Sequence, residues 1–427
     1  MNAIDNGEWL ARLLRDAPVP PITTDLERAL VAGRRGERVR RYATVTGSGL
    51  AATAVLVGAT VGVGYLRHPA LVGSGRPAAS MSASASTSMN PSLPALPGEE
   101  ATTPPNPKAR PAWAVGLAQC TITKLPAPPA GMTIETTAGD PTGRYLGVRG
   151  FRGGNYNDFV PLLWTTGVGP AALTPQAGTG NMAAINIGAI NQRGEVVAGN
   201  QVYRNGKGSL LPGLAGYSTE AFGINSAGDV VGEGYKANGS SYVALLWPAT
   251  GGIRVLPSGG KPAFAGGIAD DGTIVGWVDH QPYVWQARGG GGHALPLPAG
   301  ALGGGAAVIR GDWVGGGVRT KDSGTDGFAT DEYATRWNLR TGEVTMYPGV
   351  PGWVKDVNAR GDLLVTDLPN RITTFIRDGR PLALPTLSTK YGYPMGVSLT
   401  DNGDIGGMLA SGVPLADPAI PVYWHCG

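Results

Sequence analysis

The sequence is poor in the residues that carry much of enzyme chemistry and of charge-driven binding. Its 427 residues include only 2 cysteines and 4 histidines, and 15% of the chain is charged. None of His68, His280, His293 and His425 stands at metal-ligand spacing from another histidine or cysteine, which argues against a zinc site. The net charge of +3 is small. The densest cluster of positive charges lies just before a hydrophobic run, where it is explained as a membrane flank. Nothing else in the sequence indicates nucleic-acid binding.

Two common catalytic motifs are also missing. The chain has no Gly-x-Ser-x-Gly elbow and no Gly-x-x-x-x-Gly-Lys-Ser/Thr phosphate loop. Glycine is abundant, at 69 residues, but turns and repeats account for it. The sequence therefore offers no catalytic and no cofactor-binding residue, and it favours a protein that is not an enzyme and needs no cofactor.

A run without charged residues, 42–66, is long enough to cross a bilayer as a helix. Six arginines lie between 28 and 41, so the positive-inside rule predicts a cytoplasmic segment 1–41 and an extracellular C-terminal domain. Segment 1–41 is either a docking site for a cytoplasmic partner or a charged membrane flank. A cleaved export signal is the alternative to a retained single-pass anchor, because Arg40-Arg41 precedes the run as in a twin-arginine leader.

The next stretch, 67–117, is rich in proline, serine, alanine and threonine. Such a composition cannot bury a core, so we expect a disordered linker.

The rest of the chain, 118–427, repeats one pattern, seen most clearly at Ala221-Phe-Gly-Ile-Asn-Ser-Ala-Gly-Asp-Val-Val-Gly232. It reads as a strand, a type I turn and a second strand, since Asp or Asn favours the first turn position and Gly the fourth. The turn residues are Asp140 and Gly143, Asn191 and Gly194, Asn225 and Gly228, Asp271 and Gly272, Asn358 and Gly361, and Asp401 and Gly403, with Gly311 alone in a degenerate copy.

Two further markers follow each turn: an apolar run ending in an aromatic residue, as in Leu245-Leu-Trp247, and a strand ending in Leu-Pro or a similar pair, as in Leu256-Pro257. The repeat length ranges from 51 residues between Gly143 and Gly194 to 34 between Gly194 and Gly228. Four short strands fit this length, as in a propeller blade. The sequence thus predicts an all-β, seven-bladed propeller. A pair of β-sandwiches with chance similarity is the alternative.

The two cysteines, Cys120 and Cys426, flank the repeats. The chain ends in a third blade strand with no fourth strand after it, and the repeat region begins with a fourth strand that has none before it. We therefore predict that the N-terminal strand closes the seventh blade and that a Cys120–Cys426 disulfide secures it in an oxidising compartment. Two free thiols are the alternative.

The loops predict where ligands bind. Short turns should share one face of the propeller, and the longer, variable loops should share the other, which is where binding usually occurs. The longest loop holds Asp322, Asp326 and Asp331, hard oxygen ligands that suit calcium. Their spacing fits no defined calcium loop, so we favour a solvated acidic loop over a metal site.

The motif Ala221-x-Gly-Ile-Asn-x-x-Gly-Asp-Val-Val-Gly232 followed by Ala244-Leu-Leu-Trp247 resembles the bacterial extracellular HAF-type repeat. This resemblance implies a surface-displayed propeller and brings no catalytic residue. We expect a membrane-anchored binding module for a protein or a cell-surface polysaccharide. The alternatives are a glycan-active hydrolase or lyase, with carboxylates converging at the channel, and a signalling protein with a cytoplasmic partner on 1–41.

Overall fold

The computed structural model describes residues 113–152, 159–176, 187–236, 241–286, 290–320, 332–367, 372–388, 390–411 and 419–426. The predicted segment 1–41, the hydrophobic run 42–66 and most of the predicted linker lie outside these residues. Within the described ranges there is no helix long and apolar enough to cross a membrane. All regular structure in these ranges is β-strand.

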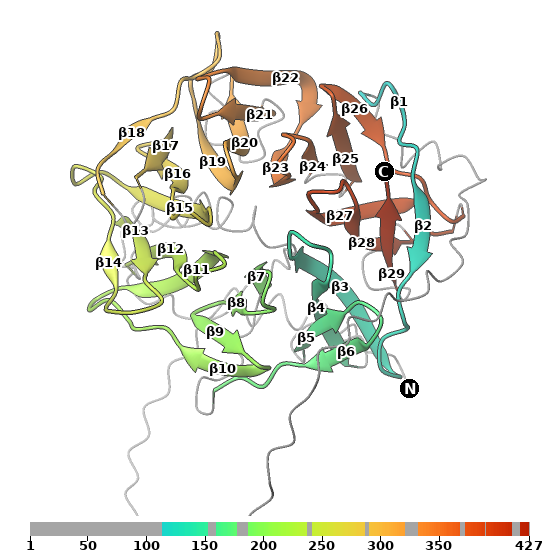
Figure 1. The fold of residues 1–427 in the computed structure, drawn as a ribbon. Coiled ribbons are helices and arrows are strands. Elements are labelled where there is room, and N and C mark those ends of the chain that lie inside the picture. The colour runs from blue at the N-terminus through green and yellow to red at the C-terminus, as the bar shows by residue number, and fades with distance from the viewer. Residues whose placement is uncertain are drawn as a thin grey trace, which may run out of the picture. The chain divides into compact units, whose positions relative to one another are not determined.

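Seven sheets stand around a central axis, so the propeller prediction is confirmed (Figure 1). Each of the first six blades uses four consecutive strands, ordered from the axis outwards, and neighbouring strands among these four are antiparallel. A sheet this small cannot bury both of its faces alone, so adjacent blades must pack on each other. The packing is seen in buried clusters that join residues of neighbouring blades, such as Val231 and Trp285.

The strands of the first three blades are β3 (Met132–Gly139), β4 (Tyr145–Arg152), β5 (Phe159–Thr165) and β6 (Gly169–Ala172); β7 (Ile187–Ile190), β8 (Val196–Ala198), β9 (Gln201–Arg204) and β10 (Lys207–Leu210); and β11 (Ser218–Ile224), β12 (Val230–Tyr235), β13 (Tyr242–Trp247) and β14 (Arg254–Val255).

The strands of blades 4 to 6 are β15 (Ala263–Ile268), β16 (Ile274–Val278), β17 (Gln281–Trp285) and β18 (Gly292–Ala294); β19 (Gly303–Arg310), β20 (Trp313–Arg319), β21 (Glu332–Asn338) and β22 (Val344–Pro351); and β23 (Trp353–Val357), β24 (Leu363–Asp367), β25 (Ile372–Arg377) and β26 (Arg380–Ala383).

Blade 7 is closed by the two ends of the repeat region, as predicted. Strands β27 (Tyr393–Leu399), β28 (Ile405–Ala410) and β29 (Ile420–His425) precede the C-terminus, and β2 (Thr121–Lys124) supplies the outer strand. Thr121 pairs with His425, and Lys124 with Val422. The predicted disulfide is confirmed: Cys120 and Cys426 are bonded across 306 residues of sequence.

One strand was not expected from the sequence. Strand β1 (Gly116–Leu117), at the end of the predicted linker, adds a fifth strand to blade 6 by pairing in parallel with β26 (Figure 1). The indole N–H of Trp113 donates to the hydroxyl of Thr374 at 3.0 Å. The chain therefore reaches the propeller along the outer edge of blade 6 before it enters blade 7.

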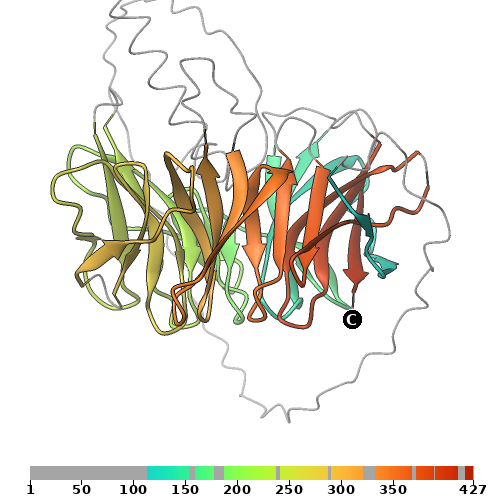
Figure 2. The same cartoon turned by 90° about the horizontal axis from the view of Figure 1, so that it is seen from above.

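The short turns within blades gather at one edge of the ring, where the C-terminus also lies (Figure 2). In blade 2 the turn closes with a hydrogen bond from the Gly194 N–H to the Asn191 carbonyl at 2.9 Å. All seven turn glycines have positive φ, between 56° at Gly311 and 93° at Gly403. We call this edge the turn face.

Candidate functional site

Every blade carries one β-bulge at the same place in its innermost strand. In blade 1, for example, Thr136 pairs with Val148 and Ala138 with Gly147, so Thr137 is the extra residue. The extra residues are Thr137, Gly188, Phe222, Gly266, Ala307, Lys355 and Val397. A bulge re-aims the side chain at its extra position, and bulges are common next to binding sites. We call these seven residues the bulge ring.

All seven residues of the bulge ring line one cavity of about 420 Å³. The C-terminal halves of the innermost strands form its wall, and residues of the turn face, such as Gln192 and Ser226, form its rim. The volume lies within the range of small-ligand sites. Because each blade contributes to the wall, the cavity exists only when the ring is closed.

Close approach of neighbouring blades explains the small residues of the ring. A Cβ atom at Gly188 would lie 2.9 Å from the carbonyl oxygen of Ala221, and one at Gly266 would lie 2.7 Å from that of Ala307. Side chains at these two positions would push the innermost strands apart. Glycine therefore keeps the backbones in contact and leaves the axis open.

Lys355 is the only charged residue of the bulge ring. Burial lowers its pKa to about 8, although the carboxylates of Asp356 and Glu135 oppose this shift. Asp356 accepts hydrogen bonds from the N–H groups of Leu399, at 2.7 Å, and Val357, at 2.9 Å. Burial raises the pKa of Asp356, while Arg310, 3.8 Å away, counteracts the shift.

A second charged pair lies near Lys355. Glu135 and Arg149 are register partners on β3 and β4, and they form a buried ion pair. Removing two charges from water is costly unless each has a partner, so the pair offsets part of its own desolvation. Glu135 Oε1 has no hydrogen-bond partner within the described part of the chain.

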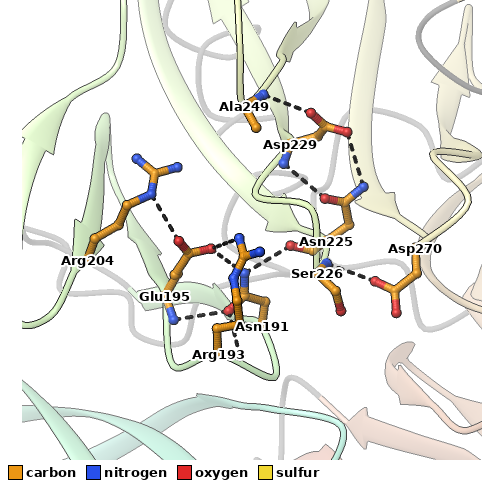
Figure 3. Close-up of polar contacts among 9 residues, drawn as sticks. All are labelled: Asn191, Arg193, Glu195, Arg204, Asn225, Ser226, Asp229, Ala249 and Asp270. Atoms are coloured by element: carbon orange, nitrogen blue, oxygen red, sulfur yellow. Dashed lines mark hydrogen bonds and ion pairs between the residues drawn. The ribbon is translucent and has the colours of Figure 1, made fainter. Parts of the chain in front are cut away.

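The rim of the cavity is held by hydrogen bonds from one turn to the next (Figure 3). Asn191 Nδ2 donates to the carbonyl of Asn225 at 2.9 Å, and Asn225 Nδ2 to the carbonyl of Ala269 at 3.2 Å. Asn358 makes the same contact with Thr400 at 3.3 Å. The asparagines therefore join blades as well as capping their own turns, a role that sequence reasoning missed.

The asparagine series is interrupted in blades 1, 4, 5 and 7, and Asp140 and Thr400 take its place in blades 1 and 7. Ala269 has no side chain that can donate, and Arg310 occupies the position before the glycine in blade 5, where the turn is reduced to Gly311 and Asp312. Arg310 instead approaches Asp356 of blade 6.

Carboxylates from several blades also reach the rim: Asp270, Asp271, Asp312 and Asp401. Each has a structural contact. Asp270 accepts from the Ser226 N–H at 2.8 Å, Asp401 from the Ala359 N–H at 2.9 Å and Asp271 from the Thr273 N–H at 2.8 Å, while Asp312 pairs with Arg340 at 3.1 Å. All four are exposed, so water screens their charges.

Other carboxyl groups lie away from the cavity. Glu220 and Glu233 stand directly opposite each other on β11 and β12. Burial raises the pKa of Glu220 to about 7 and, together with repulsion from Glu220, that of Glu233 to about 8. Neither residue lines the cavity, so the pair is a candidate for pH-dependent stability and not for ligand contact.

The calcium candidates Asp322, Asp326 and Asp331 lie outside the described residues. Among the residues that are described, no group of three or more His, Cys, Asp or Glu side chains could hold a metal ion.

No protein-family model matches the chain, and no curated protein matches it. The chain is similar to several solved structures, all at low sequence identity. Virginiamycin B lyase from Staphylococcus aureus is 14% identical, with 71% of this chain and 98% of that chain covered at a TM-score of 0.43. A gluconolactonase from Xanthomonas campestris is 13% identical, with 78% and 99% covered at 0.38. The WD40 propeller of Doa1 is 14% identical, with 70% and 96% covered at 0.41.

Proposed function

We propose that the chain is an exported binding module, held at the membrane by residues 42–66, that takes the end of a cell-surface polysaccharide into the axial cavity. The bulge ring is the observation that carries the proposal. Seven bulges at equivalent positions bring seven residues to the wall of one cavity. Bulges are over-represented next to binding sites, where they re-aim a side chain, so their recurrence around one cavity supports a common site.

The size and lining of the cavity support a chain end as the ligand. A volume of about 420 Å³ admits one or two sugar rings but no folded domain. The innermost strands are edge strands of their sheets, so their outer backbone N–H and C=O groups can serve sugar hydroxyls. Such a wall recognises hydroxyl-rich ligands without needing many polar side chains.

The disulfide supports the location outside the cytoplasm. Disulfides persist in oxidising compartments and are rare in the cytosol. Cys120–Cys426 joins the two ends of the ring, where it stabilises the closure on which the cavity depends. The anchor and the orientation of the chain rest on the sequence pattern of residues 28–66.

A substitution that fills the cavity with a larger side chain tests the proposal. Ala307→Phe places in blade 5 the residue type that blade 3 already carries at the same ring position, Phe222. Val255→Phe is the matched control, because Val255 lies on an outer strand and is 51% exposed. Full-length protein in detergent would be applied to an array of bacterial surface glycans. Loss of binding in A307F but not in V255F is expected; equal binding by both variants would remove the cavity from consideration.

Two earlier expectations remain predictions beside this proposal. A ligand on the variable-loop face is one, since much of the longest loop lies outside the described residues. A glycan-cleaving activity is the other, and the rim carboxylates on blades 4, 5 and 7 are the feature that would serve it. The contacts of these carboxylates with backbone N–H groups and Arg340 explain their presence without a catalytic role. We therefore favour a binding function over a glycan-cleaving activity.

A further inference from the structure

Two glutamates of blade 3 stand side by side in the interior. Glu220 on β11 and Glu233 on β12 are register partners, so their side chains leave the same face of the sheet and their Cβ atoms lie about 5 Å apart. Glu233 is 2% exposed, and Glu220 is half-buried. No hydrogen bond or ion pair joins either carboxyl group to another residue in the described part of the chain. Two adjacent, buried carboxyl groups repel each other strongly when both are ionised.

The strands around the pair offer little positive charge. Ala244, the register partner of Glu233 on β13, lies in one buried cluster with alanines of β15 in blade 4. The strands that pack against β11 and β12 from the neighbouring blades are β7, β8 and β15, and none of them carries a titratable side chain. Within blade 3 the strands add Tyr235, Tyr242 and, on the exposed outer strand β14, Arg254.

Two lysines follow or precede these strands, and both have other contacts. The ammonium group of Lys236 lies over the ring of Tyr217, 5.5 Å from its centroid. Lys261, at the start of blade 4, pairs with Asp279 at 2.9 Å. Protons are therefore the means by which the charge of the buried pair is neutralised.

Strand β11 connects the pair to the axial cavity. Phe222, two residues after Glu220, is the bulged residue of blade 3 and lines the cavity. Its ring packs on that of Phe264 in blade 4, with the centroids 5.0 Å apart. Because the extra residue of a bulge has no partner of its own, the pairing of β11 with β12 on either side holds Phe222 in place. Parting the strands at Glu220 should thus move a side chain of the cavity wall.

We propose that Glu220 and Glu233 form a proton-controlled gate for the axial cavity. While the pair holds at least one proton, the two carboxyl groups can share a hydrogen bond, and β11 stays paired with β12 along its length. When both groups are ionised, their repulsion parts the strands at this point and Phe222 leaves its place in the wall. The gate belongs to the cavity itself and does not depend on which ligand occupies it.

The gate should open as the pH rises. Burial raises the pKa of Glu220 to about 7, and burial together with the charge of Glu220 raises that of Glu233 to about 8. Since both values lie above those of an unfolded chain, the closed arrangement is favoured at pH 6 and is lost as the pH rises through 8. Burial and the charge of Glu233 also raise the pKa of Tyr242, which therefore stays neutral in this range.

Hydrogen exchange of the full-length protein at pH 6 and pH 9 tests whether the strands part. Protection factors, which remove the intrinsic effect of pH on exchange, should fall at least about tenfold in β11, the change expected for one pH unit of one retained proton. Strand β27, the innermost strand of blade 7, should keep its protection. Glu220→Gln/Glu233→Gln retains the shape and the hydrogen-bonding groups without the charge, so it should abolish the fall. A fall that persists in this variant, or one that is equal in β27, would overturn the gate.

Alkylation of a single thiol tests the link with the cavity. Both native cysteines are held in the disulfide, so Phe222→Cys supplies one free thiol on the cavity wall. Ala307→Cys supplies a matched thiol at the same ring position in blade 5. With a small neutral reagent, and with each rate corrected for the titration of its own thiol, the ratio of the two labelling rates should rise between pH 6 and pH 9.

The same ratio should stay constant when both glutamates are replaced by glutamine. A constant ratio with the glutamates present would show that the cavity wall does not respond to the pair and would overturn the gate, even where β11 loses protection. Neither measurement uses a glycan, so failure of the gate leaves the proposed function standing, and failure of the glycan array leaves the gate standing.

Discussion

The indole N–H of Trp285 in blade 4 donates to the carbonyl of Pro257 in blade 3 at 2.8 Å. The same bond links Trp247 to Pro212, Trp337 to Pro296 and Trp424 to Pro385, at 2.7 to 2.9 Å. The two markers of the repeat, the aromatic residue and the Leu-Pro pair, are therefore partners across the gap between blades. This contact explains why both recur at fixed places.

We expect Trp285→Phe to lower the free energy of unfolding by about 1–3 kcal/mol more than Trp164→Phe. Both indoles are almost fully buried, at 0% and 1% exposure. Trp285 Nε1 has the Pro257 carbonyl as partner, whereas Trp164 Nε1 has none among the described residues. Urea unfolding measures the free energy that each variant loses. Both variants lose the same ring volume, so the difference between their losses reports the Trp285–Pro257 hydrogen bond, and equal losses would show that this bond does not stabilise the fold.

Loss of the disulfide should destabilise blade 7 first. Cross-linking a loop of 306 residues contributes about 6 kcal/mol in the chain-entropy account. In Cys120→Ser/Cys426→Ser, hydrogen exchange should therefore accelerate in β2 and β29 before it does in blades 3 and 4. Uniform acceleration around the ring would show that closure and the other blade contacts are one cooperative unit.

Two substitutions in the asparagine series should change the stability of the protein in opposite directions. Asn225 donates to Ala269 of the next blade and accepts from the Asp229 N–H at 2.9 Å, so Asn225→Ala should cost about 1–3 kcal/mol of unfolding free energy. Ala269 stands at the equivalent position in blade 4, and Ala269→Asn should stabilise by about 0.5–1 kcal/mol if it restores the missing cap. Thermal melts of both variants check this; a destabilised Ala269→Asn variant would show that the cavity rim has no room for the amide.

Stability should fall as the pH rises from about 5 to 8. In the folded protein the pKa of Glu220 is raised to about 7 and that of Glu233 to about 8. The unfolded chain releases these protons near pH 4.5, so in this window it binds fewer protons than the folded protein. Stability is then fully present below pH 4.5 and falls by up to about 1.4 kcal/mol per pH unit for each retained proton.

Glu233→Gln should flatten this decline and raise the melting temperature at pH 8 but not at pH 4.5. Exposed Asp279, where Lys261 lowers the pKa, supplies a control: Asp279→Asn should leave the slope above pH 5 unchanged. A wild-type slope that persists in Glu233→Gln would place the titrating group elsewhere.

Proteolysis of intact cells tests the predicted membrane topology of the chain. If residues 42–66 are a retained anchor, an added protease should cut within 67–117 and leave an epitope in 1–41 intact. Cleavage within 1–41 would reverse the predicted orientation, and a mature protein that lacks 1–66 would identify a removed export signal.

The sequence determined the architecture because its signals are local and repeated. A turn such as Asn225 to Gly228 needs only its own residues to form, since asparagine caps the backbone and glycine takes the positive φ. Copies of this turn with one aromatic and one Leu-Pro marker each sufficed to predict the blades. The leftover strands at the two ends, with Cys120 and Cys426, sufficed to predict the closure.

Only the tertiary structure decided where the residues of different blades meet. The bulge at Lys355 depends on the pairing of Val354 and Asp356 with two adjacent residues of β24, and the cavity depends on seven such strands facing one axis. Aligning the repeats would have marked Lys355 as the one charged residue three positions before a turn. The sequence alone cannot show the surroundings of Lys355, because they form only when the ring closes. Glu135 and Arg149, which then lie near Lys355, belong to a blade more than 200 residues away in sequence.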